Sequence, residues 1–145
     1  MAQYDIYHLI SSFLDAGELA LNLRKKGLVK KIKPDNTPVS NGDLEVNEII
    51  TKKLIGLTPN IPIISEETSE NKNIKNPLDF WLIDPIDGTY DYINNLDEFT
   101  INAGLILNKK PVAGLINAPA KNRMFYTYGK NDAYELTNGK EIKLD

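Results

Sequence analysis

The sequence predicts an α+β fold in which two N-terminal helices pack on a mainly antiparallel sheet. Up to residue 57, apolar residues recur at the three- and four-residue spacings of helices. Two short apolar runs follow at residues 61–64 and 80–83, and beyond residue 99 turn-forming residues separate runs rich in β-branched and aromatic residues. Helices thus precede strands, and 145 residues suffice for one core, so we expect a single domain over residues 1–145.

The first helix is predicted from an apolar stripe near the N-terminus. Its members are Ile6, Leu9, Ile10, Phe13, Leu14, Ala20 and Leu21. Three cations follow at residues 24–26, where they suit the partial negative charge of a helix C-terminus, and Gly27 suits the C-cap. A lysine-rich loop containing Pro34 and Pro38 is expected to come next.

The second helix is predicted to begin near Ser40 and to end near Gly56 and Pro59. Its apolar face consists of Val46, Ile49, Ile50, Leu54 and Leu57. These residues return every three or four positions, so the helix should bury one side against the core.

The strands are predicted from unbroken apolar runs and from regularly spaced turns. Residues 61–64 and 80–83 show no polar alternation, which is typical of strands buried on both faces. A polar stretch over residues 65–76 separates them. Later breaks fall at residues 108–110, 118–119, 129–132 and 138–139. The spacing of these breaks predicts an antiparallel meander.

Composition excludes several classes of function. A formal net charge of −3 gives no electrostatic reason to bind nucleic acid. The absence of cysteine excludes disulfides and thiolate metal sites, and His8 is the single histidine, so zinc chemistry is disfavoured. No run approaches the ~20 apolar residues of a membrane span. We therefore expect a cytoplasmic protein with no membrane span, while peripheral attachment at the inner membrane is left open.

An acid-rich segment is the first sign of chemistry. Residues 66–98 carry nine carboxylates against two lysines, an excess that a cation would relieve. Within it, residues 84–89 (Asp-Pro-Ile-Asp-Gly-Thr) directly follow an apolar strand. The strand would place Asp84 at the sheet edge, and the Pro85 and Gly88 bends would turn Asp87 and the Ile86 carbonyl toward the same point. Such oxygen ligands suit Mg²⁺. The alternative is an ordinary turn, because Asp, Pro and Gly are common turn formers.

Two further acidic positions carry their own alternatives. Glu66 and Glu67 follow the strand predicted at residues 61–64, so a second strand end would deliver acid to the same edge; alternatively they form a solvated pair in a charged loop. Asp43 stands three residues after Ser40, a spacing that also fits a capping box serving only the helix N-terminus.

Taken together, these segments resemble the lithium-sensitive, magnesium-dependent phosphatase superfamily that includes inositol monophosphatase and 3′(2′),5′-bisphosphate nucleotidase. The matching segments, in chain order, are Thr37-Pro38-Val39-Ser40 with Asp43, Ile64-Ser65-Glu66-Glu67, and Trp81-Leu82-Ile83-Asp84-Pro85-Ile86-Asp87-Gly88-Thr89. Residues 33–39, 98–102, 110–114 and 118–119 are most similar to the bisphosphate nucleotidase branch. Two departures stand out: Tyr90 replaces a usual lysine, and Gly42 replaces a usual alanine.

The resemblance implies a role for each matching residue. Glu66, Asp84, Asp87 and the Ile86 carbonyl would bind Mg²⁺, with two or three ions in the complete site. Asp43 and Thr89 would orient and deprotonate the attacking water. Gly88 and Thr89 would present backbone N–H groups to the phosphate, and Lys33 would contact the substrate. The implied chemistry is metal-assisted phosphomonoester hydrolysis.

The resemblance covers this whole chain but only about the first half of the family's length. It implies the N-terminal half of a layered phosphatase fold, without the later segment that supplies another aspartate to the metals. We therefore expect an enzyme acting on a small phosphorylated substrate, most similar to a hydrolase of 3′-phosphoadenosine 5′-phosphate that yields AMP and phosphate. An inositol monophosphatase and an inactive, truncated cation-binding remnant are the alternatives. A homo-oligomer, or a second chain that supplies the missing half, is the expected partner.

Overall fold

The computed structural model describes residues 6–67, 77–127 and 132–145. The helical elements are η1 (Ile6–Leu9), α1 (Ile10–Lys26), α2 (Asn41–Leu57), α3 (Thr89–Ile93) and η2 (Pro119–Lys121). The strands are β1 (Lys30–Ile32), β2 (Pro38–Ser40), β3 (Ile63–Ser65), β4 (Phe80–Asp87), β5 (Thr100–Leu107), β6 (Lys110–Ala118), β7 (Arg123–Thr127), β8 (Ala133–Thr137) and β9 (Lys140–Leu144). The predicted α+β class is confirmed, but the order of helices before strands holds only for the strands after α2, because β1 and β2 lie between the two long helices.

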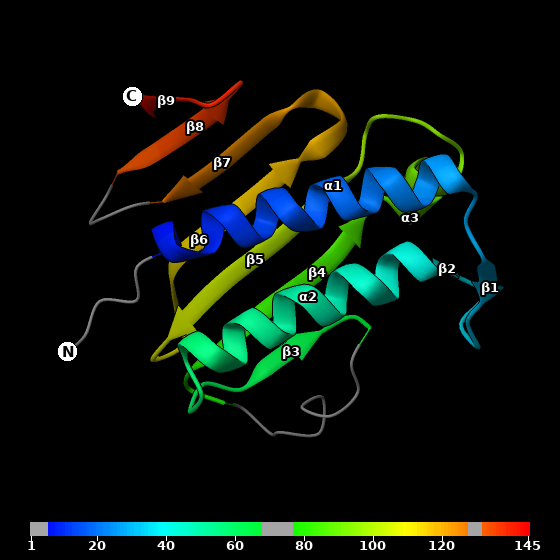
Figure 1. The fold of residues 1–145 in the computed structure, drawn as a ribbon. Coiled ribbons are helices and arrows are strands. Elements are labelled where there is room, and N and C mark those ends of the chain that lie inside the picture. Colours follow the sequence, from blue (N-terminus) through cyan, green and yellow to red (C-terminus); the bar gives the residue numbers. More distant parts are fainter. Residues whose placement is uncertain (1–5, 68–76, 128–131) are drawn as a thin grey trace.

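Seven strands form one sheet in the order β3-β4-β5-β6-β7-β8-β9 (Figure 1). Every neighbouring pair is antiparallel except β3 and β4, which are parallel. The hairpin turns fall at Asn108 with Lys109 and at Asn138 with Gly139, all four with positive φ. This left-handed backbone gives a hairpin turn the same twist as its strands, so the predicted meander is confirmed at these breaks.

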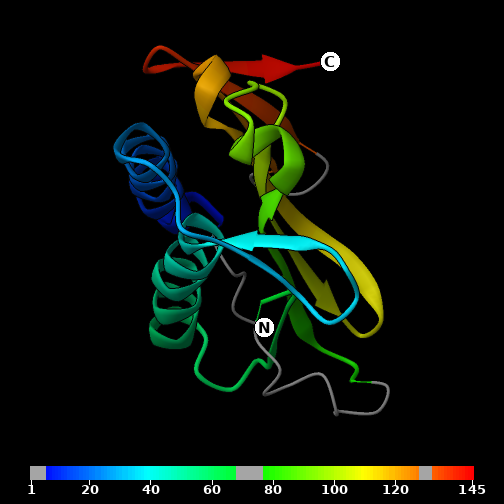
Figure 2. The ribbon, with the colours of Figure 1, turned by 90° about the vertical axis from the view of Figure 1, so that its right-hand side faces the viewer.

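The core lies between the two long helices and one face of the sheet. Figure 2 shows α1 and α2 together on one side of the sheet, and among the described residues no long helix covers the opposite side, the uncovered face. Phe13 from α1, Ile50 from α2 and Trp81 from β4 are fully buried between these layers. The Trp81 indole N–H is satisfied by the Thr58 hydroxyl at 2.9 Å, which also fixes the end of α2 to the sheet.

The prediction that both faces of the 80–83 strand are buried is wrong. Trp81 and Ile83 are buried, but Leu82 between them is 53% exposed. Helices cover only one face, so alternate residues of β4 point to the uncovered face. Ile116 of β6 is 47% exposed there as well. An unbroken apolar run therefore coexists here with one uncovered sheet face.

Three local features differ from the sequence prediction. The loop expected after α1 contains the two-stranded antiparallel hairpin β1–β2. The expected turn at residues 84–89 begins later, because β4 continues to Asp87 through a register shift against β5. A short helix, α3, follows at Thr89. The predicted helix ends hold, since Gly27 caps α1 with φ 101° and Ser40 is the N-cap of α2. Most of the polar stretch at 65–76 lies outside the described residues.

Candidate functional site

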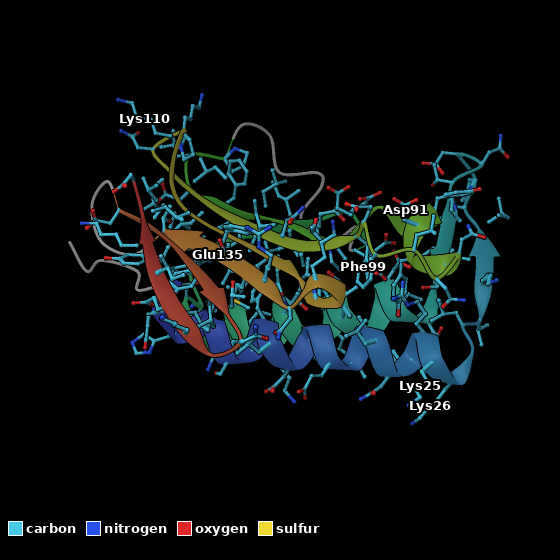
Figure 3. All side chains as sticks on the ribbon, turned by 90° about the horizontal axis from the view of Figure 1, so that it is seen from above. Lys25, Lys26, Asp91, Phe99, Lys110 and Glu135 are labelled. Atoms are coloured by element: carbon cyan, nitrogen blue, oxygen red, sulfur yellow. The ribbon has the colours of Figure 1, made fainter. Side chains whose placement is uncertain are left out.

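The acidic residues gather at the end of the sheet where β3 and β4 finish. Parallel pairing sets Ser65 beside Ile83, and the next residue continues the pairing, because the Glu66 N–H donates to the Ile83 carbonyl at 3.3 Å. Glu66 therefore follows β3 at the level where Asp84 extends β4. In Figure 3 Asp91 of α3 and Phe99 lie toward this end of the molecule, and Lys110 lies at the opposite end.

The chain changes direction sharply after Asp87. Asp84 pairs with Asn102 and Asp87 with Thr100, so the residues between them are accommodated by the register shift. Pro85 has no N–H to give to the ladder, which fits such an irregularity. Gly88 follows with φ 86°, and a Cβ there would lie 2.9 Å from the Glu98 carbonyl oxygen. Only glycine satisfies both constraints. The chain therefore bends at Gly88 and begins α3 at Thr89.

Asp84 carries the strongest electrostatic perturbation at this edge. Burial, together with the carboxylates of Glu66 and Asp87, raises the pKa of Asp84 to about 7. Its Oδ1 and the Oδ1 of Asn102 are buried without a hydrogen-bond partner among the described residues. Asn102 also donates through Nδ2 to Asp87 Oδ2 at 3.4 Å. Two neighbouring buried oxygens that lack donors are a fit for a hard cation.

The carboxylates at this edge repel one another, but they do not form a complete metal-coordination shell. Over residues 6–67, 77–127 and 132–145, no three Asp, Glu, Cys or His side chains are close enough to hold a metal by themselves. A cation at this edge would therefore need ligands besides carboxylates. Mg²⁺ meets this requirement, because it usually keeps several waters and binds through one or two carboxylates plus a substrate phosphate. The donor set thus fits Mg²⁺ as part of a larger coordination shell.

Asp43 is buried and uses its two carboxylate oxygens for different partners. Oδ2 accepts from the Ser40 backbone N–H at 2.9 Å and from the Ser40 hydroxyl at 2.7 Å, completing the capping box of α2. Oδ1 accepts from the Thr89 hydroxyl at 2.9 Å, although 46 residues separate the two. The capping interpretation is therefore confirmed, and it accounts for only one of the two oxygens.

Lys33 lies beside the acidic edge, at the bend of the β1–β2 hairpin. Its Nζ is 3.6 Å from Glu66 Oε1 and 3.5 Å from Glu67 Oε1. Burial lowers the pKa of Lys33, but the Glu67 and Glu66 carboxylates outweigh it and the net pKa is raised. The Glu67 side chain is only 7% exposed, so the interpretation of both glutamates as a solvated pair is wrong for Glu67. Lys33 supplies positive charge where the sequence predicts a cation.

Asn102 was not predicted as a member of this site, and Glu67 was predicted at this edge without a role of its own. Asn102 is a polar residue inside an otherwise apolar strand, and that break in the pattern was the available signal. Glu67 shared the motif with Glu66, but nothing in the sequence shows which of two adjacent carboxylates turns inward. The structure brings Glu66, Asp84, Asp87, Asn102 and Lys33 to one sheet edge, and Asp43 and Thr89 into contact beside it.

An apolar groove of about 810 Å³ runs from the acidic edge across the uncovered sheet face. Its lining includes Ile64, Leu82, Gly104, Ile116, Phe125 and Leu144, and its polar end is formed by Glu66, Asp84 and Asn102. The acidic edge therefore opens onto an apolar surface.

Comparison with known proteins gives consistent relatives. The family model described as the inositol monophosphatase family matches residues 3–145. The 3′(2′),5′-bisphosphate nucleotidase CysQ of Aggregatibacter actinomycetemcomitans is 36% identical over 148 residues, covering 94% of this chain and 53% of that protein. The same-named protein of Haemophilus influenzae is 38% identical, covering 82% and 46%. The chain thus spans about half the length of these relatives.

Solved structures show the same fold. The Thermotoga maritima IMPase superposes with a TM-score of 0.80 at 24% identity, covering 97% of this chain and 53% of that one. CysQ of Bacteroides thetaiotaomicron, titled a bacterial member of the inositol monophosphatase family, gives a TM-score of 0.68 at 28% identity, covering 89% and 47%. Within the described part of this chain, no helix combines the length and apolarity that crossing a bilayer requires.

Proposed function

Because the chain belongs to the inositol monophosphatase family, we propose that residues 1–145 form the N-terminal, metal-binding portion of a Mg²⁺-dependent phosphomonoesterase. The substrate proposed first is 3′-phosphoadenosine 5′-phosphate, hydrolysed to AMP and phosphate, because the curated relatives at 36–40% identity carry the name 3′(2′),5′-bisphosphate nucleotidase. Inositol monophosphate is the second candidate, because the matching family model is that of the inositol monophosphatase family.

The observation that carries this proposal is the hydrogen bond between Thr89 and Asp43 beside the acidic edge. The Thr89 hydroxyl has one proton, which it directs toward Asp43 Oδ1 at 2.9 Å and the Ile86 carbonyl oxygen at 3.2 Å, and this leaves its oxygen lone pairs to accept a proton from a water molecule. Asp43 and Thr89 thereby form a path for the proton of an attacking water. The buried position of Asp43 and its Ser40 partners hold that carboxylate in one orientation.

Glu66, Asp84, Asp87 and the Ile86 carbonyl are the proposed holders of Mg²⁺. When bound, Mg²⁺ would lower the pKa of a ligated water and neutralise charge on the phosphate and the leaving oxygen. Asn102 donates to Asp87 through its amide. The Gly88 and Thr89 backbone N–H groups, at the turn into α3, are proposed to bind phosphate oxygens. Hydrolysis adds water across the phosphoester bond, releasing phosphate and the alcohol.

We propose further that polypeptide equivalent to the relatives' remaining half covers the apolar groove. The groove begins at Glu66 and Asp84 and continues over exposed Leu82 and Ile116. A surface of this kind costs free energy in water. Polypeptide packed there could also add ligands to the acidic edge, where three acidic side chains do not converge among the described residues.

The test is phosphate release from 3′-phosphoadenosine 5′-phosphate and from inositol 1-phosphate with Mg²⁺. Asp84→Asn serves as the blank and Asp91→Asn, the same charge change on α3, as the matched control. We expect slow, Mg²⁺-dependent release that is abolished in the blank, kept in the control and faster with the bisphosphate. Faster release from inositol 1-phosphate would assign the second candidate. Release that is equal in the Asp84→Asn blank, or absent with both substrates, would leave the inactive cation-binding remnant.

A further inference from the structure

Gly42 occupies the first turn of α2, immediately before Asp43. Its backbone does not require glycine: among the described glycines, positive φ values occur at Gly27, Gly88 and Gly139. Glycine in a helix is also less favourable than alanine. The reason for glycine here is space, since an added Cβ would lie against the Tyr92 hydroxyl, 2.6 Å from Cε2 and 2.7 Å from Cζ.

Tyr92 is held on several sides and cannot easily yield to such a side chain. It is fully buried, and its hydroxyl donates to the Ala20 carbonyl oxygen of α1 at 2.6 Å. Its ring packs on Phe99 with 4.9 Å between the centroids, and the Arg24 guanidinium lies 5.6 Å from its centroid. The tether to Ala20 fixes the end of the ring that faces Gly42.

The Gly42–Tyr92 contact runs alongside the Asp43–Thr89 hydrogen bond. Gly42 and Asp43 are neighbours at the start of α2, and Thr89 and Tyr92 lie one turn apart on α3. Two contacts therefore join the same pair of short segments. If the first contact is widened, the 2.9 Å bond from Thr89 to Asp43 has to lengthen.

We propose that Gly42 and Tyr92 act as a positioning pair that sets the separation of Asp43 and Thr89. Neither residue touches the place proposed for substrate. The close approach of backbone to ring lets α3 sit against α2 at hydrogen-bonding distance. The consequence for water activation rests on the proposed function, whereas the geometric coupling does not.

The test compares Gly42→Ala, the double variant Gly42→Ala with Tyr92→Phe, and Gly56→Ala as the matched control. Gly56 is also a glycine of α2, but nothing lies within 4 Å of a Cβ added there. In Gly42→Ala we expect kcat for phosphate release to fall at least about tenfold, corresponding to about 1.4 kcal/mol. KM and Mn²⁺ affinity should stay within about twofold, because neither residue holds substrate or metal.

Tyr92→Phe should restore most of the kcat lost in Gly42→Ala. It removes both the nearest atom and the tether to Ala20, so the ring can shift away from the new methyl group. Crystal structures of the three variants give a readout independent of activity. The Thr89 Oγ1 to Asp43 Oδ1 distance should exceed the hydrogen-bonding limit in Gly42→Ala and return in the double variant.

Different results would contradict the positioning pair and the proposed function. The positioning pair is wrong if Gly42→Ala keeps wild-type kcat and the hydrogen bond, or if the double variant is no better than Gly42→Ala. If the wild-type chain releases no phosphate, the proposed function fails, and the crystallographic distances still decide the coupling. If Gly42→Ala loses its folding transition while Gly56→Ala keeps it, recovery of folding in the double variant supports the contact and its absence contradicts it.

Discussion

The Thr89 hydroxyl donates to Asp43 Oδ1 at 2.9 Å and thereby ties the start of α3 to the start of α2. The other oxygen, Oδ2, is occupied by Ser40. One carboxylate thus caps the N-terminus of α2 and also accepts a hydrogen bond from the hydroxyl group beside the acidic edge. Removing the carboxylate and removing the hydroxyl should therefore have separable effects on stability and on hydrolysis.

Thr89→Val is expected to lower phosphate release by at least about 100-fold, because it removes a positioned proton-transfer group. The free energy of unfolding should fall by only about 1 kcal/mol, since a single hydroxyl donor, shared by Asp43 Oδ1 and the Ile86 carbonyl, is lost and the shape is kept. Thr51→Val is the control: Thr51 bonds only within its own helix, to the Asn47 carbonyl at 2.8 Å. Urea unfolding and release assays on both variants measure the two quantities. Equal loss of activity in both variants would contradict the assignment of Thr89.

Asp43→Ala should destabilise the protein more than Thr89→Val does. It removes the capping-box partner of Ser40, worth about 1 kcal/mol, and leaves the buried Ser40 backbone N–H and the Ser40 hydroxyl without this acceptor. The Thr89 hydroxyl would keep only the Ile86 carbonyl oxygen at 3.2 Å. We expect a total loss of about 2–4 kcal/mol in urea unfolding. If Asp43→Ala lowered the free energy of unfolding no more than Thr89→Val does, the two carboxylate oxygens of Asp43 would not contribute separately to stability.

The raised pKa of Asp84 predicts a stability that falls as pH rises. The carboxyl has a pKa of about 7 in the folded chain against 3.8 in the reference state, so between these values the folded chain keeps a proton that the unfolded chain releases. Stability without metal should therefore decline from about pH 4 to about pH 7 and level off above. After discounting for solvent at this half-buried group, we expect about 2 kcal/mol.

Asp84→Asn should abolish this part of the decline, and millimolar Mg²⁺ should reverse it in the wild type, because a cation favours the ionised carboxylate. Urea unfolding at several pH values, with and without Mg²⁺, measures the difference between the two chains. A wild-type and an Asp84→Asn profile that run parallel through this interval would contradict the perturbation of Asp84.

Lys33 competes with any cation for the Glu66 and Glu67 carboxylates. Lys33→Gln should therefore tighten Mn²⁺ binding by about two- to fivefold, corresponding to a charge interaction of about 0.5–1 kcal/mol. Lys31→Gln is the matched control, since Lys31 is an exposed lysine on the same hairpin. If Lys33 contacts the substrate, Lys33→Gln also raises KM. Calorimetric titration of both variants distinguishes the outcomes, and equal affinities would remove Lys33 from the site.

The uncovered sheet face should make the isolated chain self-associate. Leu82 and Ile116 are exposed beside the apolar groove, and packing against a second copy would remove them from water. Sedimentation at tens of micromolar is expected to show a species larger than a monomer, and Leu82→Glu should return it to a monomer. Ile55→Glu, at an exposed position of α2, should leave association unchanged. A wild-type chain that sediments as a clean monomer would contradict the expectation.

The sequence predicted the elements whose signals are local. The stripe ending at Arg24, Lys25 and Lys26 and the Ser40 cap located the two long helices, and the Asn138-Gly139 turn located a hairpin. The exposure of Leu82 could not be predicted, because periodicity shows that a strand is apolar and not how many of its faces are covered. The short helix α3 is stabilised by tertiary contacts such as the bond from Tyr92 to Ala20.

Some features of the candidate site could likewise be predicted from the sequence, and others could not. The acidic residues could be found from their place after apolar strands, and parallel pairing brought Glu66 near Asp84. The contact between Asp43 and Thr89 spans 46 positions and was available only through resemblance. The constraint on Gly42 depends on where the Tyr92 ring lies, which no spacing reveals. Substrate, compartment and number of metal ions stay predictions.

Calorimetric titration with Mn²⁺ tests most directly the claim that the edge formed by Glu66, Asp84 and Asp87 is a divalent-cation site. Wild type, Asp84→Asn, Asp87→Asn and the control Asp91→Asn would be compared at neutral pH. We expect saturable binding in the millimolar range or tighter for wild type and Asp91→Asn. Binding should be weakened at least about tenfold in Asp84→Asn and Asp87→Asn, because each loses a charged ligand. Binding of equal strength in all four chains, or no saturable binding in the wild type, would contradict it.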